Sequence, residues 1–89
     1  MADVVMYTTR WCGFCVRARR LLQSKGVDFT DIDVGAEPQK RAEMMQKSGA
    51  RTVPQIWING EHIGGCDELY ALERSGQLDV KLQGGSHQV

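Results

Sequence analysis

The sequence predicts an α/β protein in which a four-stranded mixed sheet is flanked by helices, and three observations lead to this prediction. Short apolar or alternating runs, typical of strands, take turns with longer segments whose apolar residues recur at helical spacing. A glycine follows each of the three clearest helical segments, where a left-handed residue commonly ends a helix. Near residue 59, an Asn-Gly dipeptide separates two β-rich runs, which is a strong hairpin signal.

The first third of the chain is expected to form a strand, a helix and a second strand. Residues 4–8 are mostly apolar, as in a strand buried on both faces. A helix is expected over residues 13–25, ending at Gly26. Its apolar positions share one side and are Val16, Ala18, Leu21 and Leu22. Residues 29–34 alternate between apolar and acidic side chains, which predicts the second strand.

A second helix is expected to begin at Pro38, because the first turn of a helix does not need the N–H that proline lacks. It should end at Gly49, a residue suited to a left-handed helix cap. Ala42 and Met45 are expected to face inward.

The last third predicts a hairpin and a third helix. Residues 55–63 form the hairpin, with the Asn-Gly turn at its centre. Asp67 is expected to cap the third helix, which carries Leu69 and Leu72 on its inner side and ends at Gly76.

One domain is expected over residues 1–82, followed by a frayed tail over residues 83–89. Leu78 and Leu82 should form one more short turn against the core. The first two strands need a crossover through a helix and are therefore expected to be parallel, whereas the final hairpin is antiparallel.

Two cysteines, Cys12 and Cys15, lie where the first strand gives way to the first helix. Side chains three residues apart share a helix face, so the two sulfur atoms can meet and form a disulfide. Cys12 would stand at the helix N-terminus, where free N–H groups and the helix dipole favour a thiolate. Since the thiolate is the nucleophile in thiol–disulfide exchange, the pattern predicts redox chemistry, with Cys12 attacking and Cys15 resolving.

The cysteine pair has two alternative interpretations. The pair could belong to a zinc site, but the other candidate ligands, His62, Cys66 and His87, do not form a second knuckle. It could also be an inert part of the core, although a helix N-terminus is the place for a reactive cysteine. We therefore expect no bound metal ion.

Two further motifs follow in the sequence. In the segment 51–55, Pro54 precedes a strand, and a cis peptide bond after Val53 would turn the backbone groups of Val53 toward an extended ligand. In the segment 64–67, free N–H groups would be available to an anion and Asp67 to an ammonium group. The Cys66 side chain in this segment is expected to be a small buried residue.

Composition excludes several classes of function. The 11 basic and 11 acidic side chains cancel, which argues against nucleic-acid binding. No apolar run approaches the ~20 residues that span a bilayer, so no membrane association is expected. The N-terminus lacks the features of an export signal, and three cysteines are too few for a secreted disulfide scaffold. The expected location is the cytoplasm.

Together, three motifs resemble the glutaredoxin family in order and spacing: Cys12-Gly13-Phe14-Cys15, Thr52-Val53-Pro54 and Gly64-Gly65-Cys66-Asp67. The resemblance runs from about Val4 to Leu82 and is close to the small bacterial dithiol glutaredoxins. It implies a thioredoxin fold, a cis Pro54 and a binding site for glutathione.

The resemblance also implies roles for individual residues. Cys12 would form a mixed disulfide with glutathione, and Val53 would pair with the cysteinyl backbone of the tripeptide. The γ-glutamyl end would be held by the Cys66 backbone and Asp67. The other residues expected at the glutathione site are Arg10, Phe14, Arg41, Arg51, Thr52, Pro54 and Gly65. Of these, Arg41 and Arg51 would lie near the glycyl carboxylate, a group that suits arginine's forked donors.

Two positions depart from the family pattern. Thr9 stands where a lysine is common, and the neighbouring Arg10 is the candidate replacement. Gly13 stands where a proline is common, a feature shared with monothiol glutaredoxins, which handle iron–sulfur clusters.

The expected function is a glutathione-dependent oxidoreductase, active as a monomer, that reduces glutathionylated proteins and protein disulfides. The alternative is a carrier or sensor of a [2Fe–2S] cluster, in which two protomers and two glutathiones share one cluster through Cys12. A non-enzymatic interaction module is a third and weaker hypothesis.

Overall fold

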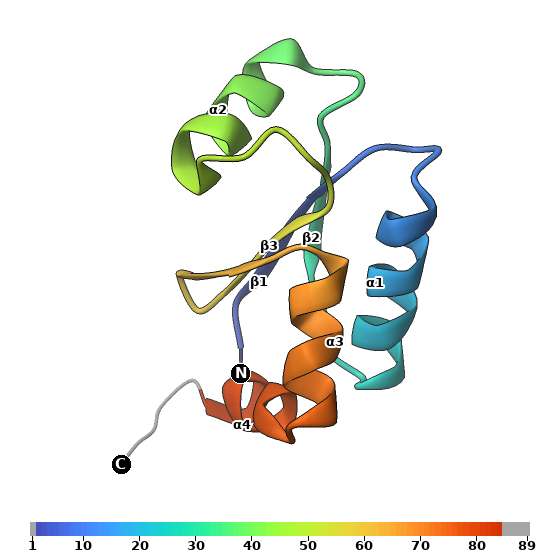
Figure 1. Ribbon diagram of the computed structural model, residues 1–89, viewed down its shortest axis with the longest axis vertical. Helices are drawn as coiled ribbons and strands as arrows, with labels where there is room; N and C mark the ends of the chain where they lie inside the picture. The colour runs from blue at the N-terminus through green and yellow to red at the C-terminus, as the bar shows by residue number, and fades with distance from the viewer. Residues whose placement is uncertain (1, 85–89) are drawn as a thin grey trace.

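Strands and helices follow one another along the chain in the predicted order (Figure 1). The computed structural model describes residues 2–84. Over this range the elements are, in chain order, β1 (Val4–Thr8), α1 (Gly13–Ser24), β2 (Thr30–Asp33), α2 (Pro38–Ser48), β3 (Gln55–Ile58), β4 (Glu61–Gly64), α3 (Cys66–Arg74) and α4 (Gln77–Gly84). No helix among these is long and apolar enough to cross a membrane.

The four strands form one mixed sheet in the order β2-β1-β3-β4. β1 pairs with β2 in parallel and with β3 in antiparallel orientation. β3 and β4 form the predicted hairpin, whose turn residues Asn59 and Gly60 have positive φ angles of 52° and 82°. Two successive residues of this kind are typical of a tight turn that matches the twist of the strands. The predicted mixed sheet is confirmed.

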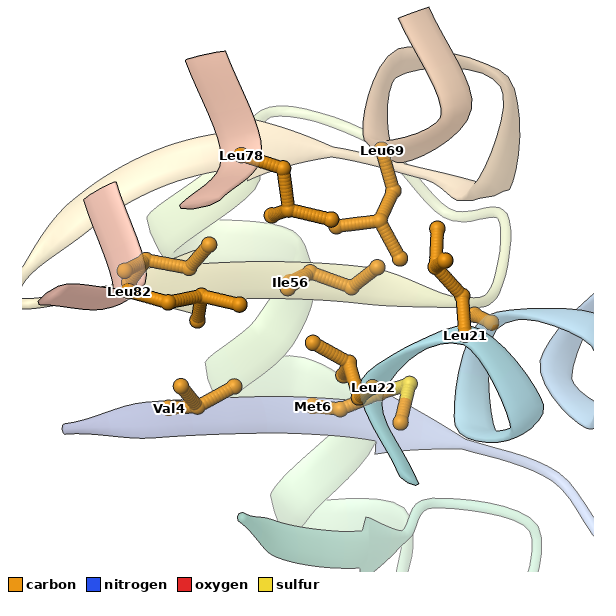
Figure 2. Packing of buried hydrophobic residues seen from close by; sticks show 10 residues of the cluster. Val4, Met6, Leu21, Leu22, Ile56, Leu69, Leu78 and Leu82 are labelled. Atoms are coloured by element: carbon orange, nitrogen blue, oxygen red, sulfur yellow. The ribbon is translucent and has the colours of Figure 1, made fainter. Parts of the chain in front are cut away.

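Alternate residues of β1 serve two separate cores, one on each face of the sheet. Val4 and Met6 belong to the larger cluster, to which α1, α3 and α4 contribute Leu22, Leu69, Leu78 and other buried side chains (Figure 2). Tyr7 points to the opposite face, where it packs with Met44 of α2. In Figure 1, α1 and α3 accordingly lie on one side of the sheet and α2 on the other.

The apolar faces of two helices differ from the prediction. Val16 in α1 is 37% exposed, because α1 meets the sheet through Cys15, Ala18, Leu21 and Leu22. In α2 the prediction that Ala42 and Met45 face inward is wrong: both are exposed, and Met44 is fully buried. Adjacent residues of a helix point about 100° apart. The sequence alone therefore does not decide whether Met44 or Met45 faces the sheet, because this depends on the strands that the helix packs against.

The start of α3 also differs from the prediction that Asp67 caps it. The cap position is Gly65, and Asp67 lies inside the first turn. Glu68 supplies the side-chain contact, since its Oε1 atom accepts a hydrogen bond from the Gly65 N–H at 2.7 Å. This is one half of a capping box, in which a glutamate three residues into the helix reaches back to the cap.

The ends of β2 and α4 differ from the predicted boundaries. β2 spans Thr30–Asp33, shorter than the predicted 29–34, although the Val34 N–H still donates to the Thr8 carbonyl at 2.9 Å. α4 is a helix of eight residues in place of the expected single turn, and it includes residues 83 and 84 of the predicted tail. Residues 85–89 and the candidate ligand His87 lie outside the described part of the chain.

We predict that replacing Leu22 by alanine lowers the free energy of unfolding by about 2–5 kcal/mol. Leu22 is fully buried in the larger cluster, so the truncation leaves a cavity that its neighbours fill only in part. Urea denaturation followed by circular dichroism measures the change. Val80→Ala is the control: this side chain is 61% exposed, and its loss should change stability by less than about 0.5 kcal/mol. Equal effects of the two substitutions would contradict the core assignment.

Candidate active site

Cys12 stands at the N-terminus of α1, as its cap residue, with extended backbone angles (φ −96°, ψ 117°). Its sulfur atom accepts a hydrogen bond from the Cys15 N–H at 3.3 Å. The thiol in turn lies 3.7 Å from the Val53 carbonyl oxygen, to which it donates. The side chain is partly exposed, so the sulfur is held by two backbone groups and remains accessible to a reagent.

Cys15 lies one turn further along α1 and is fully buried. The pKa of its thiol is raised to about 12, chiefly by burial and in part by the neighbouring Cys12, while a hydrogen bond with the Thr9 backbone acts in the opposite direction. Both cysteines are free thiols in this structure. The two sulfur atoms are therefore chemically different: one is accessible, and the other is buried and held in its neutral form.

A groove of about 180 Å³ is lined in part by Val53, the residue that the Cys12 sulfur contacts. The peptide bond between Val53 and Pro54 is cis, as the family resemblance implies. Within residues 2–84, no hydrogen bond engages the Val53 N–H, so this donor is available at the edge of the groove. The lining residues come from α1, from the loop before β3 and from the start of α3, and they are Phe14, Thr52, Val53, Pro54, Gln55, Gly65, Cys66, Asp67 and Glu68.

The turn from β4 into α3 forms one side of the groove, and its two glycines explain how it packs against the cis-proline loop. Gly64 has a φ angle of +117°, a conformation that residues with a side chain rarely adopt. A Cβ atom on Gly65 would stand 3.2 Å from the Pro54 carbonyl oxygen. Gly64 therefore permits the backbone conformation of the turn, and the missing side chain of Gly65 lets the turn approach the cis-proline loop closely.

Cys66 and Asp67 follow this turn at the N-terminus of α3, where unpaired N–H groups and the helix dipole favour an anion. Burial raises the pKa of the Cys66 thiol, and the side chain is only 4% exposed. The Cys66 side chain is thus a small buried group, as predicted. The Asp67 side chain is exposed at the groove.

The structure does not bring the three predicted arginines into the groove. Arg41 donates through Nη2 to the Arg51 carbonyl oxygen at 3.1 Å and so braces the loop that leads to Thr52. The Arg51 side chain is exposed. Arg10 lines a separate cavity together with Trp11 and other residues of the β1–α1 and β2–α2 loops.

Two groove residues were not predicted from the sequence, Gln55 and Glu68. Gln55 is only 4% exposed although it is polar, and it opens an otherwise apolar strand. A polar residue at such a position is a signal that sequence reasoning can use, because buried amides need hydrogen-bond partners. For Glu68 the signal is its spacing of three residues from Gly65, which is the spacing of a capping box.

Comparison with known proteins finds close similarity over nearly the whole chain. A family model described as Glutaredoxin matches residues 4–63. A glutaredoxin of Pseudomonas aeruginosa is 57% identical over 82 residues, which span 92% of this chain and 98% of that protein. The solution structure of a glutaredoxin from Brucella melitensis superposes with a TM-score of 0.85 at 50% identity, covering 99% of this chain and 96% of that one. The crystal structure of a buckwheat glutaredoxin–glutathione complex gives a TM-score of 0.86 at 33% identity, covering 92% and 77%.

We predict that iodoacetamide at pH 8 alkylates Cys12 well before Cys15 in the folded protein. A thiol with a pKa of about 12 is ionised in only about one molecule in ten thousand at this pH, and only the thiolate reacts. Raising the pH should accelerate the reaction of Cys15 about tenfold per unit until its pKa is reached. Mass spectrometry of the digested protein locates each adduct.

Alkylation in urea is the control for this prediction, because all three cysteines should react at similar rates once the chain is unfolded. Equal rates for Cys12 and Cys15 in the folded protein would contradict the difference between the two thiols.

We predict that Gly64→Ala lowers the free energy of unfolding by more than about 1 kcal/mol, because alanine is strained at positive φ. The new Cβ atom would also lie 2.9 Å from the Glu68 side chain. Gly13→Ala is the matched control: nothing lies within 4 Å of a Cβ atom there, and its φ angle is not positive, so stability should be equal or slightly higher. Denaturant titration compares them. A Gly64→Ala protein as stable as the wild type would rule out the strained turn.

Proposed function

The chain belongs to the glutaredoxin family of thiol–disulfide oxidoreductases and has its thioredoxin fold, and from this premise we propose that it uses glutathione as its thiol substrate. It would reduce glutathionylated proteins and protein disulfides, with Cys12 as nucleophile and Cys15 as the resolving thiol. A reducing compartment such as the cytoplasm would supply the glutathione and keep the cysteines reduced.

One observation carries the proposal: the Cys12 sulfur lies 3.7 Å from the Val53 carbonyl oxygen, at the edge of a groove of about 180 Å³. A thiol peptide bonded to Cys12 would therefore begin beside a backbone that still has a free N–H and carbonyl group. Backbone groups of this kind can pair with an extended peptide in the manner of an added strand. A similar protein, the buckwheat glutaredoxin, has been crystallised with glutathione.

Each end of the tripeptide has a candidate partner in this arrangement. The cysteinyl backbone would pair with Val53, beside Thr52 and Pro54. The γ-glutamyl end carries both an ammonium and a carboxylate group, and we assign these to the Asp67 carboxylate and to the N–H group of Cys66, since the Gly65 N–H already donates to Glu68.

The glycyl carboxylate would extend past the groove toward Arg51 and Arg41. Arg41 already donates to the Arg51 carbonyl, so we propose that it acts mainly by holding this loop, while the exposed Arg51 side chain contacts the carboxylate. The exposed ring of Phe14 would cover the sulfur end of the ligand. Arg10, which lines a separate cavity and lies two residues before Cys12, would attract the incoming anionic thiol in place of the lysine missing at Thr9.

The proposed reaction on a glutathionylated protein has two exchange steps. The Cys12 thiolate attacks the glutathione sulfur of the mixed disulfide, and the target cysteine leaves as a thiolate that takes a proton from water. A second glutathione thiolate then attacks the glutathione sulfur on Cys12, which releases oxidised glutathione and restores the Cys12 thiolate. The Cys15 N–H, which donates to the Cys12 sulfur, stabilises the charge that develops there in both steps.

With a protein disulfide, Cys12 attacks first and one target thiolate leaves. Cys15 then loses its proton and attacks the Cys12 sulfur, which releases the second target thiolate and forms a Cys12–Cys15 disulfide. Two glutathiones return this disulfide to the dithiol. Because the Cys15 thiol is held neutral by burial, it does not compete with Cys12 for the first attack.

A [2Fe–2S] cluster shared by two protomers is the second candidate function. Within residues 2–84, no group of three or more potential metal ligands comes together, so one chain by itself does not provide a cluster site. Of the three thiols, only Cys12 is accessible. A cluster would thus take one thiolate from each of two chains and two from glutathione. The observation that favours it is the open space at Gly13, where a Cβ atom would meet no other atom of the described residues within 4 Å.

We predict that Cys12→Ser reduces activity to background on every disulfide substrate, because no other accessible thiol replaces it. Cys15→Ser should keep turnover of a glutathionylated peptide and lose the reduction of protein disulfides, since only the second route needs a resolving thiol. A coupled assay with glutathione, glutathione reductase and NADPH measures both activities. A Cys12→Ser protein that still turns over the glutathionylated peptide would disprove the mechanism.

For the cluster, the expected result after anaerobic purification with glutathione is a brown dimer that contains iron. Cys15→Ser should behave in the same way, whereas Cys12→Ser should give a colourless monomer. A visible spectrum, iron analysis and size-exclusion chromatography make the measurement. A colourless, iron-free wild-type monomer would refute the cluster proposal and leave the oxidoreductase proposal standing.

A further inference from the structure

We propose that His62 is a positioning residue of the active site. It contacts Gln55, which holds the Thr52 carbonyl, and so it fixes the loop of residues 52–54 that lines the substrate groove. The substrate part of this inference rests on the proposed function. The contacts themselves do not, because they exist in the free protein.

Gln55 is the link between the strand and the loop. Its Nε2 atom donates to the Thr52 carbonyl oxygen at 3.0 Å and lies 3.3 Å from the Thr52 hydroxyl. Both residues line the groove, and Gln55 is only 4% exposed. The amide therefore ties the residue immediately before Val53 to the first residue of β3, and it closes the loop around the cis-proline bond.

The orientation of this amide fixes the proton on His62. If the amide were reversed, the Gln55 Oε1 atom would face the Thr52 carbonyl oxygen, and two acceptors would meet. With Nε2 on Thr52, Oε1 must accept from its other neighbour, the His62 Nε2 atom, at 2.7 Å. His62 therefore carries a proton on Nε2 and acts as the donor that completes the hydrogen bonds of a buried amide.

The His62 ring is itself held in place by aromatic packing. It stacks on Trp57 with ring centroids 4.7 Å apart and an angle of 34° between the rings. Trp57 in turn meets Tyr7 edge to face at 5.3 Å. The Tyr7 hydroxyl donates to Glu43 of α2, so the stack is anchored on the side of the sheet that α2 covers. The packing of His62 against Trp57, and of Trp57 against Tyr7, thus helps to orient the His62 ring toward Gln55.

Loss of the His62 donor would leave Gln55 Oε1 without its partner inside the protein. A buried acceptor without a partner is unfavourable, so the amide would turn toward water and release the Thr52 carbonyl. The loop of residues 52–54 would then adopt several conformations. Substrate binding should weaken for this reason, while the chemistry at Cys12, which has its own contacts with Cys15 and Val53, should change little.

Two substitutions separate the donor from the ring. His62→Phe keeps an aromatic ring on Trp57 and removes the donor, whereas His62→Gln keeps an N–H donor and removes the ring. We expect His62→Phe to raise KM for a glutathionylated peptide about 5- to 10-fold, the effect of one lost hydrogen bond, with kcat within about twofold. His62→Gln should return KM to within about twofold of the wild type. Glu61→Gln is the control on the same strand, because it alters only an exposed ion pair with Lys81.

Nuclear magnetic resonance of the free protein tests the contact without any substrate. The His62 ring nitrogens should show the proton on Nε2 in the neutral form, and the Gln55 side-chain amide protons should exchange slowly in the wild type and His62→Gln, and faster in His62→Phe. A proton on Nδ1, or equal exchange in all three proteins, would overturn the inference. An equal rise in KM for His62→Phe and His62→Gln would also overturn it.

These two experiments distinguish the inference from the proposed function. If the wild type fails to turn over the glutathionylated peptide, the proposed function is wrong, and the resonance measurement still decides whether His62 holds Gln55. If the wild type is active and His62→Phe has an unchanged KM, the inference is wrong and the proposed function stands.

Discussion

The antiparallel pairing of β1 with β3 is the constraint on which the active site depends. In this register Tyr7 lies opposite Gln55, so the last residues of β1 and the first residues of β3 lie side by side at the same end of the sheet. The loop that carries Cys12 leaves from the first strand there, and the loop that carries Val53 and Pro54 enters the second. A slip of one residue would send the side chains of β1 to the wrong faces and separate the Cys12 sulfur from the Val53 carbonyl.

The same pairing explains why two cysteines in one turn of helix have different properties. β1 buries the inner side of α1 in the larger core, and Cys15 lies on that inner side with Ala18 and Leu22. Cys12, at the cap, is left at the surface between the helix end and the Val53 loop. We propose that Cys12 attacks first and Cys15 resolves because the fold buries Cys15 and leaves Cys12 accessible.

Local patterns in the sequence were sufficient to predict several features of the fold. Strand and helix order, the Asn59-Gly60 turn and the place of Cys12 at a helix start all follow from spacing and from residues with special backbone properties. The cis bond at Pro54 was implied only through the family resemblance, because most bonds before proline are trans. The choice of Met44 over Met45 as the buried residue of α2 needed the sheet partner, which no local pattern supplies.

Long side chains and long-range contacts account for the remaining differences. Arginines such as Arg41 have many rotamers, so a position in the chain does not say whether the guanidinium reaches a ligand or, as here, a loop carbonyl. The contact between Gln55 and His62 joins residues of two strands, close to an irregularity in the β3–β4 register between Ile56 and Trp57. No sequence periodicity encodes such a contact.

Several main-chain groups border the groove: the unpaired N–H of Val53 and its carbonyl beside Cys12, the Pro54 carbonyl against Gly65, and the N-terminus of α3. Main-chain groups are the same whichever amino acid carries them. Outside the glycine and proline positions and the side chains of Gln55 and Asp67, the chain can therefore accumulate substitutions around the groove without losing these main-chain contacts. Evolutionary divergence in this region would then alter which protein surfaces fit against Cys12 while recognition of a peptide backbone is preserved.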